Sequence, residues 1–598
     1  MRIGLLTEGG YPYVSGDAGL WCDRLVRGLE QHEFEVYALS RTEGQENAGW
    51  VALPPQVSRV RTAPLWTARD DGAAHGRRAR RRFAESYGEL AAALCEGDSS
   101  DAAALPQAAP TAQADRFATA LYGLAELARD EGGLVGALRS EGAVRALERA
   151  CRAPGALRTA REARVPDLLA VAAHLESALR PLSLDWYDDQ GEEAGRGLGA
   201  VDVCHAASGG AAALPGLLAR HFFDVPLLVT EYGVRLRTHY LSSGHGASCE
   251  GPGSPPSAAA ADAAHTPAPA VRALLAAFHG RLAAEVYRQA ACVTPGNAHA
   301  RRWQERCGAD RAKLRTVYPG METSRFADVG DSPDAADPHT LVWVGRVEPA
   351  KDLVSLLHAF AEIRKQEPRT RLRIIGAATG EEGRAYLGHC RMLAAQLFPD
   401  EADGPHAVGD NPVSFEEIGG PESATLAEAY AAGAVVVLSS VVEGFPVGLV
   451  EAMLCGRATV STDVGAVVEV IGGTGLVVPP RNPRALADAC VALLHDPERR
   501  ARLGAAARAR ALELFTVEQN VTAFHGIYLE LVAQAPMRRY LVDDDGDPRP
   551  FAVPPEACLP GLWAGPGASF TARPGPAWAA ADRQARGASP VAATEGAR

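Results

Sequence analysis

Short apolar runs alternate with helical repeats along much of the chain. Residues 2–9 begin apolar and end in glycine, residues 19–29 repeat apolar positions at helical spacing, and residues 34–40 are apolar again. Strand, helix and strand in this order are typical of a parallel sheet with crossover helices. The chain therefore opens as an α/β domain.

The same alternation returns twice further along. Residues 201–233 contain two apolar runs that each end in a glycine-containing loop, and a second series runs from LVWVG at 341–345 to GLVVPP at 475–480. Two such series predict an α/β protein with two Rossmann-like domains facing a cleft, an N-terminal domain at 1–330 and a C-terminal domain at 331–514.

Four segments depart from this pattern. Residues 41–199 have helical periodicity broken by alanine- and proline-rich stretches, which predicts a mostly helical insertion in the N-terminal domain. Residues 246–270 are of low complexity and predict a disordered loop. Residues 515–536 predict a last amphipathic helix, and the Pro-, Gly- and Ala-rich tail at 537–598 predicts a largely disordered end.

Composition excludes several classes of protein. Hydrophobic residues make up 47% and charged residues 22% of the 598 residues, a globular balance, and a net charge of -13 argues against a nucleic-acid partner. Eleven cysteines include no CxxC pair, which argues against a disulfide framework or a zinc site. Because no apolar stretch reaches about 18 residues and no signal-peptide core is present, we expect no transmembrane helix and a cytoplasmic location.

The stretch SSVVEGFPVGLVEAMLCG, residues 439–456, places a turn between an apolar strand and a helix. Pro446 suits the first position of that helix. The amides near Gly444 and Phe445, with the helix dipole, then form an anion site that suits a diphosphate. Glu451 lies about one turn into the helix and reaches toward a pair of sugar hydroxyls, whereas Glu443 faces the cleft.

Two cations follow the strand LVWVG. Arg346 offers a planar fork of donors and Lys351 a mobile point charge, a combination that suits a diphosphate. Either residue alone reads as a solvated surface charge. Their shared position after a strand end, in the same half of the chain as the Glu443 stretch, favours a ligand.

Together these residues resemble the donor-binding signature of the retaining glycosyltransferases of family 4. The resemblance spans about residues 290 to 480 and also includes Gly320, Phe326, Gly345, Ile375, Gly376, Ser440 and the segment DVGAVVE at 463–469. The N-terminal TEGGYPYVSGDAGLWCDRLVRGL, the TEYG at 230–233 and the helical insertion further resemble the subgroup that includes the cytoplasmic glycosyltransferase of Pel exopolysaccharide synthesis.

The resemblance implies a GT-B fold and a retaining hexosyltransferase that uses a nucleotide sugar, expected to be a UDP-sugar such as UDP-glucose. It assigns the diphosphate to Arg346 and Lys351, the ribose to Glu451, and the donor sugar to Glu443 with the Gly444-Phe445 backbone. Pro446 and Ser440 complete the donor site. Retention proceeds by front-face attack with the leaving diphosphate as base, and neither a metal nor another cofactor is required. The expected partners are a glycan acceptor and a membrane polysaccharide-synthesis complex.

The N-terminal half departs from the family pattern at two places. The loop around Gly16 is expected to approach the donor phosphates, but Gly16-Asp17 stands where the family has Gly-Gly, and an aspartate there would repel a diphosphate. Tyr232 stands where the subgroup favours histidine. His205 matches a family histidine near the donor sugar, so we expect catalytic contacts from His205, Glu443, Arg346 and Lys351, although a lone histidine is more often structural.

Two other functions stay open. A UDP-sugar 2-epimerase of related fold would need acid and base groups gathered around the sugar, and the sequence does not assemble them. A non-catalytic subunit of a polysaccharide-export assembly would explain the Gly16-Asp17 departure. Two motifs are decoys: VDDDGD at 542–547 reads as a solvated acidic patch rather than a metal-binding DxD, and TEGGYPYVSGDAG lacks the spacing of a dinucleotide fingerprint.

Overall fold

The computed structural model describes nine stretches of the chain, namely residues 1–13, 17–68, 72–96, 111–187, 197–233, 268–330, 337–399, 411–420 and 425–535. Gly16, the acidic VDDDGD segment, the tail from 537 and nearly all of the low-complexity loop at 246–270 lie outside these stretches.

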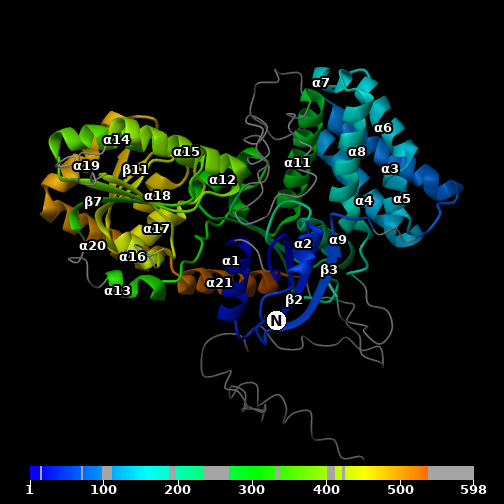
Figure 1. Ribbon diagram of the computed structural model, residues 1–598. Coiled ribbons are helices and arrows are strands. Elements are labelled where there is room, and N and C mark those ends of the chain that lie inside the picture. Colours follow the sequence, from blue (N-terminus) through cyan, green and yellow to red (C-terminus); the bar gives the residue numbers. More distant parts are fainter. Residues whose placement is uncertain are drawn as a thin grey trace, which may run out of the picture. The chain divides into compact units, whose positions relative to one another are not determined.

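Six parallel strands form the first sheet (Figure 1). They are β1 (Arg2–Glu8), β2 (Glu33–Ser40), β3 (Val57–Pro64), β4 (Val203–Ala206), β5 (Leu227–Glu231) and β6 (Cys292–Pro295). Their order, β3-β2-β1-β4-β5-β6, is that of a doubly wound Rossmann sheet, and β1 pairs with β4 so that Leu5 faces His205. The topological switch point of this sheet therefore lies between β1 and β4.

The second sheet repeats the same plan. Its strands are β7 (Asp337–Val344), β8 (Arg371–Ile375), β9 (Val413–Glu416), β10 (Gly433–Leu438), β11 (Ala458–Thr462) and β12 (Leu476–Val478). The order β12-β11-β10-β7-β8-β9 again reverses between the first and fourth strands of the domain, here β7 and β10. The expected pair of Rossmann-like domains is confirmed, and ligands in such sheets bind beyond the carboxyl ends of the strands at the switch point.

Helices cover both faces of the second sheet. The helices of this half are α13 (Ala327–Gly330), α14 (Leu353–Gln366), α15 (Gly380–Leu397), α16 (Leu426–Ala431), α17 (Val447–Leu454), α18 (Val467–Ile471), α19 (Pro483–His495) and α20 (Pro497–Leu514). On β7, Leu341 and Trp343 belong to one core cluster and Val342 and Val344 to another. Successive side chains of a strand point to opposite faces, so burial of both faces explains the unbroken apolar run.

The first sheet shares one hydrophobic core with the helical insertion. The helices of this half are α1 (Asp17–Gly28), α2 (Glu43–Asn47), α3 (Arg77–Cys95), α4 (Thr111–Glu131), α5 (Leu134–Leu138), α6 (Glu141–Arg152), α7 (Arg158–Arg161), α8 (Val165–Leu179), α9 (Ala213–Phe223), α11 (Pro269–Gln289) and α12 (Ala298–Arg306). Figure 1 shows α3, α4, α6 and α8 gathered into one bundle.

The insertion begins later than the sequence predicts. Strand β3 lies within the stretch 41–199 that was expected to be helical, and the bundle starts at α3. The sequence VSRVRTAP of β3 mixes charged and apolar residues because the strand pairs with β2 alone and lies at the sheet edge. An edge strand is not buried on all sides, so it lacks the continuous apolar run by which the other strands were recognised.

The final helix, α21 (Val517–Gln534), packs against the N-terminal half. The Tyr528 hydroxyl lies 2.6 Å from Nδ1 of His205, and Asn520 accepts a hydrogen bond from the indole of Trp21 at 3.3 Å. The rings of Trp21, His205 and Phe524 contact one another edge-on or tilted, with centroids 5.3 to 5.7 Å apart. This aromatic cluster anchors the end of the described chain to the first sheet.

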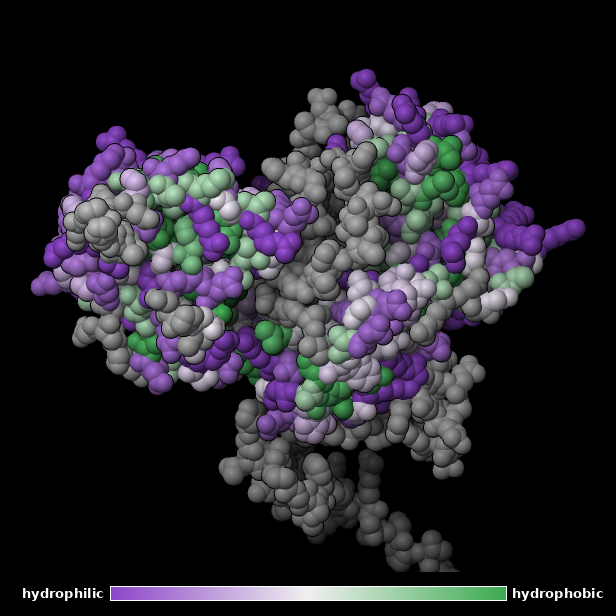
Figure 2. Space-filling view, viewed as in Figure 1, coloured by the Kyte–Doolittle hydropathy of each residue, from purple (hydrophilic) through white to green (hydrophobic). Residues whose placement is uncertain are grey.

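The face of the molecule drawn in Figure 2 is mainly hydrophilic, and its apolar side chains form small separate groups. Within the described stretches, no helix combines the length and the apolar character that crossing a membrane would require.

His205 gives a testable consequence of this packing. Its side chain is fully buried, and burial lowers its pKa to about 3, whereas an unfolded histidine has a pKa of about 6.5. The unfolded state therefore binds more protons between these two pH values. The contribution of the buried neutral His205 imidazole to the unfolding free energy is complete above about pH 6.5 and is lost as the pH falls toward 3.

We expect His205→Gln to reduce the slope of the unfolding free energy against pH by ~1.4 kcal/mol per pH unit, because the unfolded state no longer binds one more proton than the folded state. Denaturant unfolding between pH 6 and 4 measures this slope. The matched control is His495→Gln, which removes a histidine whose side chain is 54% exposed and hydrogen-bonded to Glu367. The change of slope in His205→Gln should exceed any change in this control. Equal slopes for His205→Gln and the wild type would contradict the lowered pKa of His205 in the folded state.

A second prediction concerns the contact between the ends of β7 and β8. A Cβ atom added to Gly376 would lie 1.7 Å from the carbonyl oxygen of Gly345, which is inside any non-bonded contact distance. We expect Gly376→Ala to lower the unfolding free energy by at least ~2 kcal/mol. The control is Gly388→Ala in α15, where a Cβ meets nothing within 4 Å and replacement should stabilise the helix by ~0.5–1 kcal/mol. Chemical denaturation of both variants is the measurement.

Candidate functional site

The loops after β7 and β10 carry the residues predicted to bind a donor. Arg346 lies two residues after the end of β7, and Lys351 ends the 3-10 turn Pro349–Lys351 that leads into α14. Ser440 and Glu443 follow β10. Because β7 and β10 are hydrogen-bonded neighbours at the switch point, their loops meet at the carboxyl edge of the sheet, where ligands bind in this architecture.

Lys351, Ser440 and Glu443 form one bonded group. The Lys351 ammonium forms an ion pair with Oε1 of Glu443, and the Ser440 hydroxyl donates to the same oxygen at 2.8 Å. The Lys351 and Glu443 side chains are only 16% and 11% exposed. An ammonium has three donors and a carboxylate about four acceptor positions. The ammonium therefore retains donors for a ligand while the pair stays bonded.

Backbone contacts hold the two loops together. The Ser439 hydroxyl donates to the Lys351 carbonyl at 2.7 Å, and the Val441 amide donates to the Ala350 carbonyl at 2.9 Å. The Thr462 hydroxyl, at the end of β11, donates to the Ser440 carbonyl at 2.6 Å. The ammonium and the carboxylate are thus presented by loops tied to each other and to the next strand.

Gly465 explains part of the DVGAVVE segment. It has φ +58°, and a Cβ there would lie 2.4 Å from the Glu443 carbonyl oxygen. Its neighbour Ala466 donates to the Gly444 carbonyl at 3.1 Å. The loop after β11 therefore packs tightly beneath the Glu443–Gly444 loop. The segment was recognised in the sequence, but this supporting role was not.

Helix α17 begins one residue later than predicted. Pro446 is its N-cap, not its first residue, and its carbonyl accepts from the Leu449 and Val450 amides at 3.1 and 3.2 Å. Within the described stretches the amides of Gly444 and Phe445 donate no hydrogen bond. Unpaired amides before a helix N-terminus are suited to an anion. The ring of Phe445 packs between Tyr318 and Phe515, with centroids at 6.4 and 5.8 Å.

Glu451 lies one turn into α17, as the sequence predicts. Its Oε2 accepts a hydrogen bond from the Tyr430 hydroxyl at 2.9 Å. Burial, and then the nearby Glu451 carboxylate, raise the pKa of Tyr430 well above its usual range, so the hydroxyl keeps its proton and donates. Tyr430 was not identified from the sequence, because no motif links a residue of α16 to a carboxylate 21 positions later.

Arg346 is the exposed member of the set. Its guanidinium forms no ion pair or hydrogen bond with the residues that the structure describes. The backbone on either side is fixed, since the Gly345 and Val347 amides donate to the Ile375 and Ala377 carbonyls at 3.1 and 3.0 Å. An exposed guanidinium on a backbone held by these hydrogen bonds suits an anionic ligand that arrives from solvent.

His205 is placed differently from the rest. It lies on β4, fully buried, and its Nε2 is 2.7 Å from the Thr230 hydroxyl while Nδ1 meets Tyr528. Both ring nitrogens are thus occupied inside the aromatic cluster. This environment is that of a structural histidine and not that of the catalytic contact that we expected from the sequence.

The other N-terminal positions are only partly described. Tyr232 packs edge-on against Trp21, and its hydroxyl accepts from the Asn520 side-chain amide at 3.0 Å. It therefore joins the same cluster as His205. Asp17 begins α1, and Gly16 lies outside the described residues, so the expected approach of this loop to the phosphates stays a prediction.

Comparison with known families separates the two halves of the chain. Residues 1–312 match a family model described as a domain of unknown function (DUF3492), and residues 338–496 match the model of the glycosyl transferases group 1. The second match covers β7 to β12 and hence the bonded group of Lys351, Ser440 and Glu443.

Curated relatives match a part of the chain. A D-inositol 3-phosphate glycosyltransferase of Kineococcus radiotolerans is 33% identical over 225 residues, 34% of this chain and 49% of the relative. Its counterpart from Streptomyces bingchenggensis is 30% identical over 238 residues, 37% of this chain and 49% of the relative. The chain thus spans about half the length of the curated relatives it matches.

Among solved structures, sucrose-phosphate synthase from Thermosynechococcus elongatus is similar with a TM-score of 0.50 and 17% identity. The alignment covers 89% of this chain and 99% of that one, which supports the GT-B fold. The chain belongs to the family of the domain of unknown function (DUF3492), and in it that domain precedes a group 1 glycosyltransferase domain.

Proposed function

We propose that the chain is a retaining glycosyltransferase that moves a hexose from a nucleotide sugar to a glycan acceptor. The observation that carries this proposal is the bonded group of Lys351, Ser440 and Glu443 at the switch point of the second sheet. The match of residues 338–496 to the glycosyl transferases group 1 supports it.

Each donor contact follows from the charge that a residue presents. Lys351 and Arg346 bind the diphosphate, assisted by the Gly444 and Phe445 amides at the start of α17. Glu443 accepts hydroxyls of the transferred sugar, and Glu451, oriented by Tyr430, accepts those of the ribose. We propose a UDP-sugar as donor, with UDP-glucose as the first to test.

The reaction needs charge stabilisation more than a protein nucleophile. The bond between the sugar C1 and the diphosphate oxygen breaks, and a bond from C1 to the acceptor oxygen forms on the same face. The acceptor hydroxyl proton passes to the departing diphosphate, so atoms and charge balance. Cations placed where negative charge grows on the leaving group stabilise the transition state more than the ground state.

The biological setting belongs to the same proposal. The resemblance of the N-terminal segment to the Pel subgroup supports a role in exopolysaccharide or cell-surface glycan synthesis beside a membrane complex. The nine cysteines in the described stretches are buried and form no disulfide with one another, which supports a reducing, cytoplasmic location.

A donor screen tests the proposal. The purified chain is incubated with UDP-, GDP- and ADP-sugars, and nucleotide release and sugar products are followed. Release with retention at the anomeric carbon supports the glycosyltransferase. A sugar product epimerised at C2 would instead indicate a UDP-sugar 2-epimerase. If the chain bound none of the nucleotides, the non-catalytic subunit would be favoured.

We expect Lys351→Ala to weaken UDP binding by at least ~1.5 kcal/mol, about tenfold in Kd, because a charge-assisted hydrogen bond is lost. Calorimetric titration measures the difference. Lys365→Ala serves as control, since that ammonium is 68% exposed and lies in the last turn of α14. Unchanged UDP binding by Lys351→Ala would remove the basis of the site.

Glu443→Gln should separate the diphosphate from the sugar. The replacement takes the negative charge away from Lys351, so UDP should bind at least as tightly as to the wild type. Transfer should fall at least ~10-fold, because an amide is a weaker acceptor for the sugar hydroxyls. Titration with UDP and steady-state transfer provide the two readouts, with Glu362→Gln as an exposed control. Weaker UDP binding by Glu443→Gln together with normal transfer would contradict the assignment of Glu443 to the transferred sugar.

A further inference from the structure

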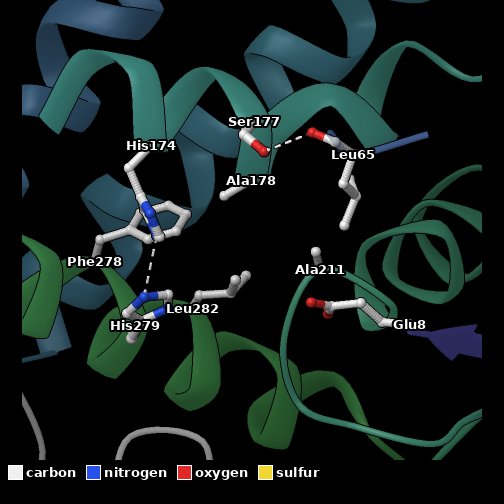
Figure 3. Close-up of a pocket in the computed structure, with 9 residues that line it drawn as sticks. All are labelled: Glu8, Leu65, His174, Ser177, Ala178, Ala211, Phe278, His279 and Leu282. Carbon is white, nitrogen blue, oxygen red and sulfur yellow. Dashed lines mark hydrogen bonds between the residues drawn. The ribbon is translucent and has the colours of Figure 1, made fainter. Parts of the chain in front are cut away.

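A cavity of about 60 Å³ opens at the switch point of the first sheet (Figure 3). Glu8 ends β1 and Ala211 follows β4, so the two strands that flank the switch point both contribute. The remaining wall comes from Leu65 after β3, from His174, Ser177 and Ala178 of α8 and from Phe278, His279 and Leu282 of α11. The helical insertion therefore completes a site that a Rossmann sheet alone would leave open.

The polar groups of the cavity lie at opposite ends. In Figure 3 the Glu8 carboxylate faces the cavity from one side, and the two imidazoles lie on the other. His174 and His279 meet through their Nε2 atoms at 3.2 Å. In Figure 3 Ala178 and Leu282 lie between these ends and Ala211 lies on the Glu8 side. The ring of Phe278 packs beside both imidazoles, with centroids 6.4 Å from His174 and 5.4 Å from His279. This arrangement complements a sugar ring, which carries hydroxyls around its edge and C–H groups on its faces.

The charge of the cavity argues against a phosphate. The Glu8 side chain is 2% exposed and pairs with Arg41 at 3.3 Å. This end therefore presents carboxylate oxygens, which accept hydrogen bonds from hydroxyls but receive none from the unprotonated oxygens of a phosphate. The two imidazoles share one hydrogen bond, which requires at least one neutral ring and limits the pair to a single positive charge. A neutral hydroxylated ligand is compatible with both ends, whereas a phosphate is not.

The size of the cavity limits the ligand as well. A water molecule needs about 10–15 Å³ of such space, so the cavity has room for about four to six waters. This space matches several hydroxyls and carbons of one sugar ring rather than a longer saccharide. The rest of the acceptor must lie outside the mouth.

We propose that this cavity, formed by Glu8, the His174–His279 pair and Ala178, binds one neutral sugar unit of the acceptor. The inference rests on the proposed glycosyltransferase function and adds the acceptor class and its subsite. It sets the chain apart from enzymes whose acceptor is a phosphorylated polyol. The ends of the sugar bond to the carboxylate and the imidazoles, and its apolar face packs against Phe278.

The test uses the full chain saturated with UDP. The probes are the methyl glycosides of glucose, galactose, mannose and N-acetylglucosamine, with D-inositol 3-phosphate as the anionic alternative. Titration followed by NMR gives their Kd values. We expect at least one neutral glycoside to bind and the inositol phosphate to bind at least tenfold more weakly. Tighter binding of the phosphate, or no binding of any glycoside, overturns the proposal.

A cavity-filling variant locates the site. Ala178→Leu adds three carbons to a side chain that lines the cavity, and we expect at least a tenfold loss of glycoside affinity. Ala173→Leu on the exposed side of the same helix is the matched control and should behave as the wild type. Glu8→Gln keeps the shape, should weaken the glycoside about tenfold and should relax the rejection of the phosphate.

UDP binding separates the two proposals. All three variants should bind UDP as the wild type does, because the donor residues lie on the second sheet. Failure of the wild type to bind UDP would count against the glycosyltransferase itself. Normal UDP binding with unchanged glycoside affinity in Ala178→Leu would overturn the subsite alone.

Discussion

The hydrogen bonds between β7 and β10 determine where ligand chemistry is possible in the second domain. These neighbours pair so that Val435 lies opposite Leu341, and the chain leaves them toward opposite edges of the sheet. Loops that diverge in this way leave an opening above the sheet, bordered by the helix that follows each strand. The ammonium of Lys351 and the carboxylate of Glu443 meet there because strand order, not sequence distance, brings their loops together.

Close backbone contacts then make the opening rigid. Gly376 lies against the Gly345 carbonyl and Gly465 against the Glu443 carbonyl, so closely that a Cβ atom on either glycine would collide with the carbonyl oxygen. Hydroxyls of Ser439 and Thr462 bond to carbonyls of the same loops. A charged pair held by such contacts loses little conformational freedom when a ligand arrives, so more of the interaction energy appears as affinity.

The sequence predicted what is encoded locally. Unbroken apolar runs marked β7 and β10, and the residues that follow them indicated an anion site. The edge strand β3 has no such run, and β9 has only Val413–Glu416. Contacts between distant segments carry no local signal either. The bond from Tyr430 to Glu451 and the covering of His205 by Tyr528, 323 positions later, depend on tertiary packing.

The two switch points differ in charge although their strand order is the same. The second gathers an ammonium, a guanidinium and the N-terminus of α17 around a carboxylate, a balance in which an added diphosphate is attracted. The first gathers a buried carboxylate already paired with Arg41 and a pair of imidazoles that carries at most one charge, so its cationic groups are fewer and its carboxylate oxygens accept hydrogen bonds from hydroxyls. Because one fold supplies both openings, the side chains that the strand ends and the surrounding helices place there decide which ligand each accepts. A chain that binds an anionic donor in one half and a neutral acceptor in the other needs this asymmetry, since two cationic openings would both retain the diphosphate.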